Sequence, residues 1–229
     1  MAGEEAPGVG CDFVQVTMFR SVPGAQAALF ATIDSLRKSD VRYVVHPVDY
    51  FLSETRLEQR AEIFKALEAI AGQADMGMIL HDETTAWGTR LEGIFAEAFD
   101  EAMARLSAVC PVSIENAVHS PDAVWFWRRF ARSVTLDVGH LESAGLDSRA
   151  FISALDAATL GKIDYVHVHR YDRAASYDHR GLNEGCRELS ALKTLLAARP
   201  DAGVILELIN KDEIEDNLNM LYNLNMAQG

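Results

Sequence analysis

The chain has 229 residues, of which 49% are hydrophobic and 24% are charged, and its 34 acidic side chains outnumber the 21 basic ones. This composition is that of an ordinary globular protein and excludes disorder, collagen and coiled coil as descriptions of the whole chain. The formal charge of −13 argues against nucleic acid as a partner, because a nucleic-acid interface needs a basic face.

Two further features bear on location and on domain organisation. No apolar run approaches the roughly 20 residues of a membrane helix, and the acidic start MAGEEAPGVG is unlike a signal or transit peptide. We therefore expect a cytoplasmic protein that does not contact a membrane. We also expect a flexible N-terminus over residues 1–11 and a single domain over residues 12–229.

Short segments rich in β-branched residues alternate along the chain with longer amphipathic segments. The strand-like segments are residues 13–19, 42–47, 76–83, 112–116, 133–140, 164–170 and 203–210, and each is bounded by residues that favour turns. The segments with helical spacing are residues 25–38, 55–72, 91–109, 122–131, 148–160 and 186–199. This alternation predicts parallel strands, because each crossover connection needs a dozen or more residues.

The choice is then between a closed barrel and an open doubly wound sheet. Neither GxGxxG nor a P-loop follows the first strand-like segment, so the nucleotide-binding forms of the open sheet lose support. A TIM-type barrel has eight strands and about 250 residues. We therefore predict an α/β fold, a (β/α) TIM-type barrel that is compact or lacks about one strand–helix unit.

The alternation of side chains along a strand predicts which residues share a face. Glu115, Asp137 and Glu207 occupy the polar face near the carboxyl ends of their segments, where barrels build their active sites. His167 and His169 have the same parity, so either one can supply a nitrogen at this end. A lone acid at a strand end is usually a cap, but several unpaired carboxylates inside a barrel need a cation. This donor set suits one divalent ion, Mn²⁺, Mg²⁺, Co²⁺ or Zn²⁺.

The phrases SIEN, TLDVGH, HVHRYD, DHRGLNEG and VILEL occur in an order that resembles the xylose-isomerase-like TIM barrel superfamily, from about residue 41 to residue 208. That superfamily includes sugar isomerases and epimerases and the apurinic endonucleases of the deoxyribonuclease IV type. The resemblance implies that its shared metal-ligand quartet corresponds here to Glu115, Asp137, His169 and Glu207. His169 is preferred because Asp172 completes the pattern His-x-x-Asp. Asp172 itself either orients a ligand histidine or caps a turn.

Four further residues are candidates for binding the substrate, and the resemblance implies three of them. His140 matches a histidine that contacts substrate or a further metal, and His46 and His81 fall where endonuclease-like members place extra ligands. Arg173 is a candidate for binding a phosphate or carboxylate. The set of expected substrate-binding residues is therefore His140, His46, His81 and Arg173.

The function that this resemblance implies is a metal-dependent isomerase or epimerase. Glu115 and Glu207 would act as base and acid on a small sugar or hydroxy-ketone, with the metal stabilising an enediolate. One alternative is a zinc-dependent phosphodiester hydrolase like endonuclease IV. Such enzymes carry Asp-x-His in the loop after the seventh strand, whereas Tyr177 stands two residues before His179. The other alternative is a binding or degenerate barrel without turnover. Exposed aromatic side chains near Trp125 would suit a homo-oligomer.

Overall fold

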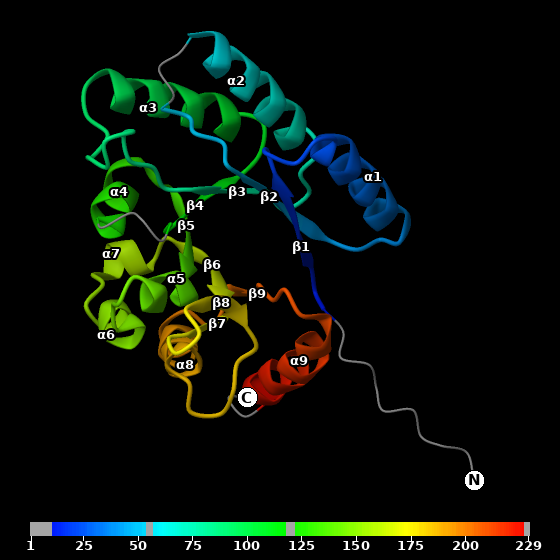
Figure 1. Ribbon diagram of the computed structural model, residues 1–229, viewed down its shortest axis with the longest axis vertical. Coiled ribbons are helices and arrows are strands. Elements are labelled where there is room, and N and C mark those ends of the chain that lie inside the picture. Colours follow the sequence, from blue (N-terminus) through cyan, green and yellow to red (C-terminus); the bar gives the residue numbers. More distant parts are fainter. Residues whose placement is uncertain (1–10, 54–56, 118–121, 227–229) are drawn as a thin grey trace.

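The computed structural model describes residues 11–53, 57–117 and 122–226. Its strands lie side by side around a central axis, and its helices lie outside them (Figure 1). The N-terminal segment expected over residues 1–11 lies outside the described residues, except for Cys11. None of the helices in the described part of the chain has the length and apolar character that a membrane span requires.

Seven strands form one sheet in which every neighbouring pair is parallel, in the order β1-β2-β3-β4-β5-β6-β9. Each of them overlaps one strand-like segment of the sequence, so the predicted α/β, TIM-type barrel is confirmed. The strands are β1 (Val14–Phe19), β2 (Tyr43–Val48), β3 (Met78–His81), β4 (Val112–Glu115), β5 (Ser133–Asp137), β6 (Ile163–Val168) and β9 (Gly203–Leu206).

Helices connect successive strands, as parallel pairing requires. They are α1 (Ala25–Lys38), α2 (Leu57–Ala71), α3 (Ile94–Ser107), α4 (Ala123–Phe130), α5 (Val138–Ser143), α6 (Ser148–Ser153), α7 (Ala157–Leu160), α8 (Arg187–Ala198) and α9 (Lys211–Met226). Between β6 and α8 the chain also forms an antiparallel hairpin of β7 (Arg170–Asp172) and β8 (Tyr177–Arg180).

One predicted strand is shorter than its apolar pattern suggests, and one predicted helix is divided in two. A capping aspartate explains each difference. The strand predicted over residues 133–140 ends at Asp137, whose carboxylate accepts a hydrogen bond from the backbone N–H of His140 and caps α5. The helix predicted over residues 148–160 is divided into α6 and α7, because Asp156 caps α7 by accepting from the N–H of Thr159. Aspartate is among the best N-caps, so it starts a new helix where periodicity alone predicts continuation.

The barrel has an open side between its first and last strands. Among the described residues, β1 pairs with β2 alone and β9 pairs with β6 alone. We call this gap between β1 and β9 the seam. A Cβ at Gly203 would lie 3.0 Å from Cζ of Phe13, so the missing side chain of Gly203 lets the start of β1 approach β9. A seven-stranded barrel with a seam agrees with the expected loss of one strand–helix unit.

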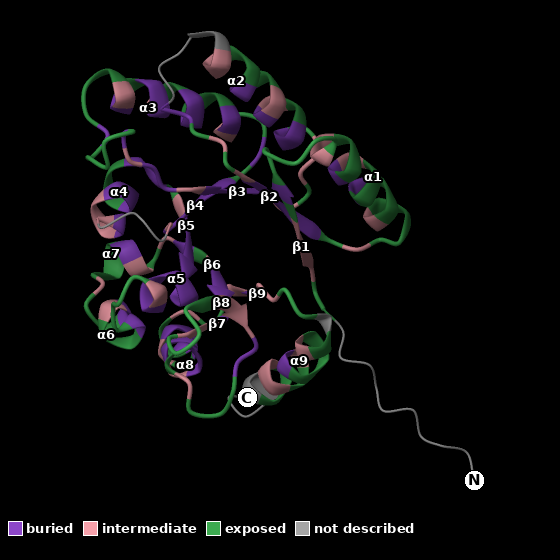
Figure 2. Ribbon diagram, in the orientation of Figure 1, coloured by how far each residue is buried: buried purple, intermediate pink, exposed green. Residues whose placement is uncertain are grey.

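The core has two parts, which follow from the alternation of side chains in the strands. A large buried cluster fills the space between the strands and the surrounding helices. Figure 2 shows β2 to β6 and the inner faces of most helices largely as buried, whereas β1 and β9 are mostly intermediate. A separate small cluster consists of Val44, Ile79 and Ile205, packed with Phe13, Met76 and Tyr165. Its members have the inward parity of their strands, so this small cluster forms an apolar layer inside the barrel.

Candidate functional site

A layer of polar side chains lies above the small apolar cluster, at the next inward position of each strand. In β4 and β5 the position below is held by Ser113 and Thr135, whose hydroxyls lie 2.7 Å apart. The register places His81 opposite Glu115 and Asp137 opposite His167, so these side chains reach one level of the barrel. The members of this polar layer, one from each strand or the residue that follows it, are Gln15, His46, His81, Glu115, Asp137, His167 and Glu207.

Four members of the polar layer form a compact group of possible metal ligands. One ligand atom each from Glu115, Asp137, His167 and Glu207 lies within 4.8 Å of the others. Nδ1 of His167 is 3.2 Å from Oε1 of Glu115, 3.5 Å from Oε1 of Glu207 and 3.8 Å from Oδ2 of Asp137. We call these four residues the carboxylate group.

The carboxylate group fits a divalent cation by its unsatisfied atoms as well as by its composition. Both side-chain oxygens of Glu115 and Nδ1 of His167 are buried and have no hydrogen-bond partner among the described residues. Buried polar atoms without partners are costly. Three carboxylates with one imidazole are donors that Mn²⁺, Mg²⁺, Co²⁺ or Zn²⁺ accept. A cation bound in the carboxylate group would satisfy Nδ1 of His167 and Oε1 of Glu115 at once.

The histidine in the carboxylate group differs from the one that the sequence pattern favoured. His169 and His167 share a parity, but His169 follows the end of β6, whereas His167 lies within β6 at the level of Asp137. Nε2 of His169 lies 3.3 Å from Oδ2 of Asp137, and His169 belongs to a different group of ligand atoms from Glu115 and Glu207. The structure thus groups the three expected carboxylates with His167 and places His169 in the neighbouring group, beside Asp137.

Glu115 also faces a second group of ligand atoms, formed with His46 and His81. Its Oε2 lies 3.3 Å from Nε2 of His46 and 3.6 Å from Nε2 of His81. Nδ1 of His46 lies 3.1 Å from the carbonyl oxygen of Ile79, so a proton on Nδ1 leaves Nε2 as the nitrogen that faces Glu115. The two oxygens of one carboxylate therefore face two different sets of nitrogens.

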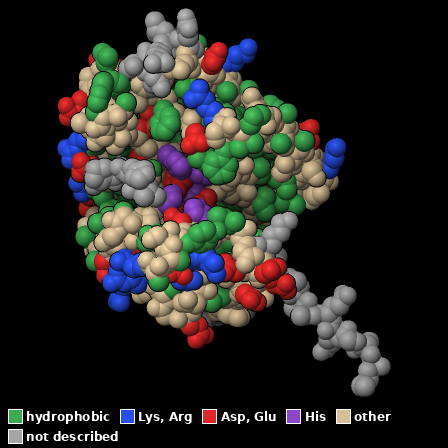
Figure 3. Space-filling view, in the orientation of Figure 1, with side chains coloured by type: hydrophobic (Ala, Val, Ile, Leu, Met, Phe, Trp, Pro, Cys, Tyr) green, Lys and Arg blue, Asp and Glu red, His purple; other side chains and the backbone are tan. Residues whose placement is uncertain are grey.

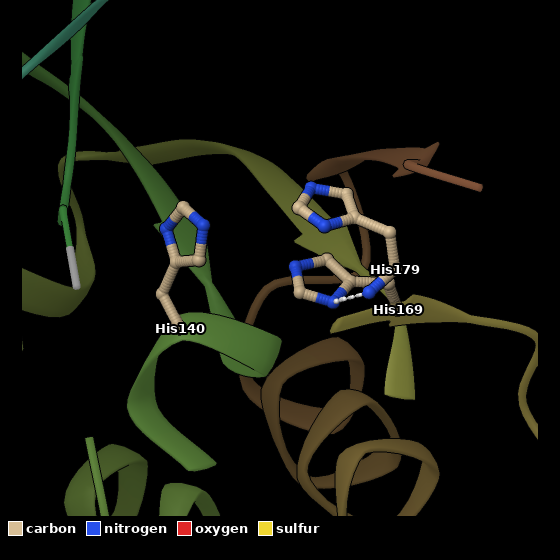
Figure 4. A group of neighbouring side chains, drawn as sticks. All are labelled: His140, His169 and His179. Carbon is tan, nitrogen blue, oxygen red and sulfur yellow. Dashed lines mark hydrogen bonds between the residues drawn. The ribbon is translucent and has the colours of Figure 1, made fainter. Parts of the chain in front are cut away.

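A third group of ligand atoms contains only histidines, His140, His169 and His179. Figure 4 shows the rings of His169 and His179 stacked on one side, with His140 of α5 facing them. The stacked rings are 4.2 Å apart with an angle of 6° between their planes. Nδ1 of His140 is 3.0 Å from the carbonyl oxygen of Asn116, so donation there leaves Nε2 available. We call these three residues the histidine trio.

The local sequence explains how Asp137 and His140 are held in place. Oδ1 of Asp137 accepts from the N–H of His140 at 2.7 Å, which leaves Oδ2 for the site. The side chain of Asn116 accepts from the backbone N–H of Asp137 at 2.8 Å and donates to its carbonyl oxygen at 2.9 Å. Gly139 is required because a Cβ there would lie 2.1 Å from the ring of His169. The phrases SIEN and TLDVGH thus carry supporting residues as well as possible ligands.

Neighbouring carboxylates and imidazoles shift each other's pKa in this site. Burial lowers the pKa of His46 to about 4, so His46 is neutral at pH 7. Burial also opposes charge on His167, but the carboxylates of Glu115 and Glu207 outweigh it and raise the pKa of His167 to about 9. The pKa of Asp137 lies well below its usual range because nearby imidazoles outweigh its burial. The site therefore holds an ionised Asp137 beside the imidazolium of His167.

Two residues that the sequence connected with the site lie elsewhere. Arg173 donates to Oε2 of Glu142 at 2.8 Å and lines a separate cavity of about 510 Å³, so the structure does not bring it to the carboxylate group. Oδ1 of Asp172 accepts from the N–H groups of Ala174 and Ala175 at 3.1 and 3.2 Å. Of its two possible roles, Asp172 therefore has that of a turn cap.

The site opens to the surface through a cavity of about 1380 Å³ that follows the seam. Figure 3 shows histidine side chains at the bottom of a hollow in the face of the molecule. The residues of the site that line this cavity are Gln15, His46, His81, Glu115, His140, His179 and Glu207. The cavity is large enough for a small molecule, since ligand pockets usually have about 300–1,000 Å³. Gln15 carried no signal that sequence reasoning used.

Comparison of the chain with models of protein families and with curated protein sequences gives no match. Comparison with solved structures gives matches to sugar epimerases and to a protein called SacUVDE. A D-tagatose 3-epimerase-like protein is 14% identical, covers 95% of this chain and 90% of its own, and has a TM-score of 0.59. D-psicose 3-epimerase with D-tagatose from Clostridium cellulolyticum H10 is 10% identical, with coverage of 96% and 89% and a TM-score of 0.64. SacUVDE is 17% identical, with coverage of 89% and 73% and a TM-score of 0.60.

The TM-scores establish similarity of fold, and four of the matching structures are named as sugar epimerases or isomerases or as proteins like them. The seven parallel strands, six of them joined to the next by helices, agree with a TIM-type barrel, a fold whose active sites lie at the carboxyl ends of the strands. The chain therefore has the TIM-type barrel fold of these solved structures, which is the fold that the order of its sequence phrases implied.

Proposed function

We propose that the chain is a metal-dependent isomerase or epimerase that acts on a small sugar or hydroxy-ketone. The observation that supports this most directly is the carboxylate group itself, in which three carboxylates and one imidazole lie within 4.8 Å of one another at the bottom of an open cavity. Isomerases and epimerases need a base beside a polarised carbonyl. The structural similarity to sugar epimerases supports the same class.

The metal would be held by Glu115, Asp137, His167 and Glu207. When bound, a divalent cation supplies a Lewis acid that draws electron density from the oxygens of a hydroxy-ketone. The side chain of Glu207 lines the cavity and is 12% exposed, whereas that of Glu115 is fully buried. Glu207 is therefore the carboxylate of the pair that a substrate meets first.

Glu207 has the properties of the general base. Its burial opposes ionisation, but the charge on His167 and the neighbouring ring of His179 outweigh burial and keep its pKa well below the usual value. Oε2 of Glu207 lies 3.6 Å from Nε2 of His179, which places this oxygen on the cavity side. In our proposal Oε2 takes the α-proton, and Glu115, in its protonated form, gives a proton from the opposite side of the group. Glu207 then passes its proton to water in the cavity and Glu115 takes one up, which restores both carboxyls.

The test is exchange of the α-hydrogen with solvent. A panel of keto-sugars from tetroses to hexoses and their phosphates is incubated in D₂O with the protein and Mn²⁺, and deuterium at the α-carbon is followed by NMR. We expect exchange for at least one member, its loss in Glu207→Gln, and no loss in the matched control Glu184→Gln, because Glu184 is an exposed acid outside the site. Absence of exchange over the whole panel contradicts the proposal.

A second candidate function is hydrolysis of a phosphodiester at a centre with several metal ions. The observation that favours it is that the two oxygens of Glu115 face separate groups, His46 and His81 on one side and His167 on the other. A carboxylate between two sets of ligands is the arrangement of a bridging ligand in a two-metal site. The charge of −13 weakens the case for nucleic acid as the substrate.

Metal content separates the two candidates. Elemental analysis of the protein after dialysis against Zn²⁺ and then against metal-free buffer gives the number of ions per chain. One ion supports the isomerase or epimerase, whereas two or three ions, together with hydrolysis of bis(p-nitrophenyl) phosphate, support the hydrolase. His81→Ala is the variant that should reduce the count in the second case alone, since His81 does not belong to the carboxylate group.

A further inference from the structure

Gln15 is the one member of the polar layer that bears neither a carboxylate nor an imidazole. It lies in β1, on the open side of the barrel. Its side-chain amide nevertheless contacts two members of the carboxylate group. The amide nitrogen donates to Oε1 of Glu207, and the amide oxygen lies 2.8 Å from Nε2 of His167.

These two contacts determine the orientation of the amide. An ionised carboxylate only accepts hydrogen bonds, so the Gln15 atom that faces Glu207 must be the NH₂ group. The amide oxygen then faces His167, and because that oxygen only accepts, Nε2 of His167 must carry the proton. The remaining nitrogen of the ring, Nδ1, is then the one without a proton when the ring is neutral.

Nδ1 of His167, the ring nitrogen without a proton, is the one that faces the carboxylates. Nδ1 of His167 is 3.2 Å from Oε1 of Glu115 and has no hydrogen-bond partner among the described residues. A histidine that ligates a metal through one nitrogen usually donates the proton of its other nitrogen to a carbonyl or carboxylate oxygen, which fixes the ring. The amide of Gln15 has that position relative to His167.

Gln15 also spans the seam at the level of the site. No backbone ladder joins β1 to β9 in the described part of the chain, yet the Gln15 amide joins β1 both to β6, through His167, and to the residue that follows β9, Glu207. In a closed barrel, backbone hydrogen bonds would hold the two neighbouring strands at this level. Here one side chain connects them.

We propose that Gln15 is the positioning residue of the metal site: its amide holds Glu207 and the Nε2–H of His167 across the seam, and so presents Nδ1 of His167 to the cation. This inference rests on the proposed function in one respect, namely that the carboxylate group binds a metal. Gln15 itself touches neither the cation nor the substrate in this role. Its effect is on metal affinity and on the tautomer of His167.

Binding of Mn²⁺ by the full chain tests the proposal through affinity. The dissociation constant is measured by competition with a chelating indicator for the wild type, Gln15→Leu and Thr17→Val. Gln15→Leu removes both contacts, and loss of such a supporting hydrogen bond typically costs about 10–100-fold in metal affinity. Thr17→Val is the matched control, since Thr17 lies two residues along the same strand and accepts only a 3.2 Å bond from the amide. We expect its affinity to stay within about threefold of the wild type.

The tautomer of His167 gives a readout that does not depend on a variant. In ¹⁵N-labelled protein loaded with Zn²⁺, we expect the ¹⁵N shifts of His167 to show a proton on Nε2 and a metal on Nδ1. A proton on Nδ1 would overturn the proposal. A folded Gln15→Leu chain with wild-type affinity for Mn²⁺ would overturn the role of Gln15 alone, whereas a wild-type chain that binds no Mn²⁺ would overturn the proposed function as well.

Discussion

Oδ1 of Asp178, in the β7–β8 hairpin, lies 2.8 Å from Nδ1 of His169. A carboxylate at this distance accepts the Nδ1–H and fixes the ring, whose Nε2 faces Oδ2 of Asp137 at 3.3 Å. The backbone N–H of His179 lies 3.3 Å from the same Nδ1 but 3.0 Å from Oδ1 of Asp178, so the carboxylate satisfies both donors. Asp178 therefore orients His169, a role that the sequence pattern offered to Asp172.

Under the second candidate function, in which the histidine trio also holds an ion, replacement of Asp178 by asparagine should weaken Zn²⁺ binding at the trio. The amide can also accept from Nδ1–H, but it lacks the charge that favours this tautomer, and we expect a loss of about 10-fold or more in affinity. The measurement is Zn²⁺ bound per chain in buffers of fixed free Zn²⁺. Asp172→Asn is the control, because Asp172 caps a turn and does not contact His169. Equal Zn²⁺ content in the two variants would contradict the orienting role.

Gly139→Ala should displace His169 and destabilise the fold. The new Cβ would lie 2.1 to 2.5 Å from three ring atoms of His169, so the ring must leave its place beside Asp137. Overpacking of this kind costs about 1–3 kcal/mol. Urea unfolding measures the decrease in unfolding free energy. Gly72→Ala is the control, because a Cβ at Gly72 would lie 3.4 Å from its nearest atom and no decrease is expected. Equal unfolding free energies for the two variants would show that the ring adapts.

The carboxylates of the site could be predicted from the sequence because they depend on strand parity alone. Glu115, Asp137 and Glu207 have the inward parity, and any parallel barrel brings the carboxyl ends of its strands together. Which histidine joins these carboxylates depends also on the register between β5 and β6. His167 and His169 share a parity, and the β5–β6 pairing, which shifts between Val134 and Thr135, decides which of them reaches the level of Asp137.

The contributions of neutral and long side chains could not be predicted in the same way. A glutamine in a strand belongs to no metal-binding or catalytic motif, so the sequence does not predict a role for Gln15. Its role follows from the fold, which brings β1 across the seam to Glu207 and His167. Arg173 has a flexible side chain, and the buried carboxylate of Glu142 turns it away from the metal groups. The strands β7 and β8 are short and polar. They lack the alternation of apolar and polar residues from which a strand is predicted, so the sequence did not predict this hairpin.

Binding of Mn²⁺ to the carboxylate group should tighten as the pH rises. The pKa of His167 is raised to about 9 without a metal, so below that pH a cation must displace a proton from the ring. We expect the apparent affinity to rise about tenfold per pH unit between pH 6 and 8.5. Titration in a weak buffer should also show release of about one proton per Mn²⁺ at pH 7. A constant affinity over this range would mean that His167 is not a ligand.

Glu142→Gln should destabilise the fold at neutral pH and less so in acid. The Glu142 side chain is 2% exposed. Burial opposes its ionisation, but hydrogen bonds from Ser148 and from Arg173 and Arg187 outweigh burial and lower its pKa. A carboxylate whose pKa is lower in the folded state stabilises the fold above the pKa of the unfolded chain. That stabilisation disappears as the pH falls through the folded value.

We therefore expect Glu142→Gln to lower the unfolding free energy by about 1–3 kcal/mol at pH 7, with the difference from wild type narrowing as the pH falls below about 4.5. Urea unfolding at pH 7, 5, 4 and 3 provides the measurement. Glu184→Gln, at an exposed position in the loop before α8, should differ from wild type by less than about 0.5 kcal/mol at every pH. Once the wild-type carboxylate is protonated, the wild type and Glu142→Gln no longer differ in charge. A difference in unfolding free energy that stays constant down to pH 3 would therefore show that the substitution acts through packing.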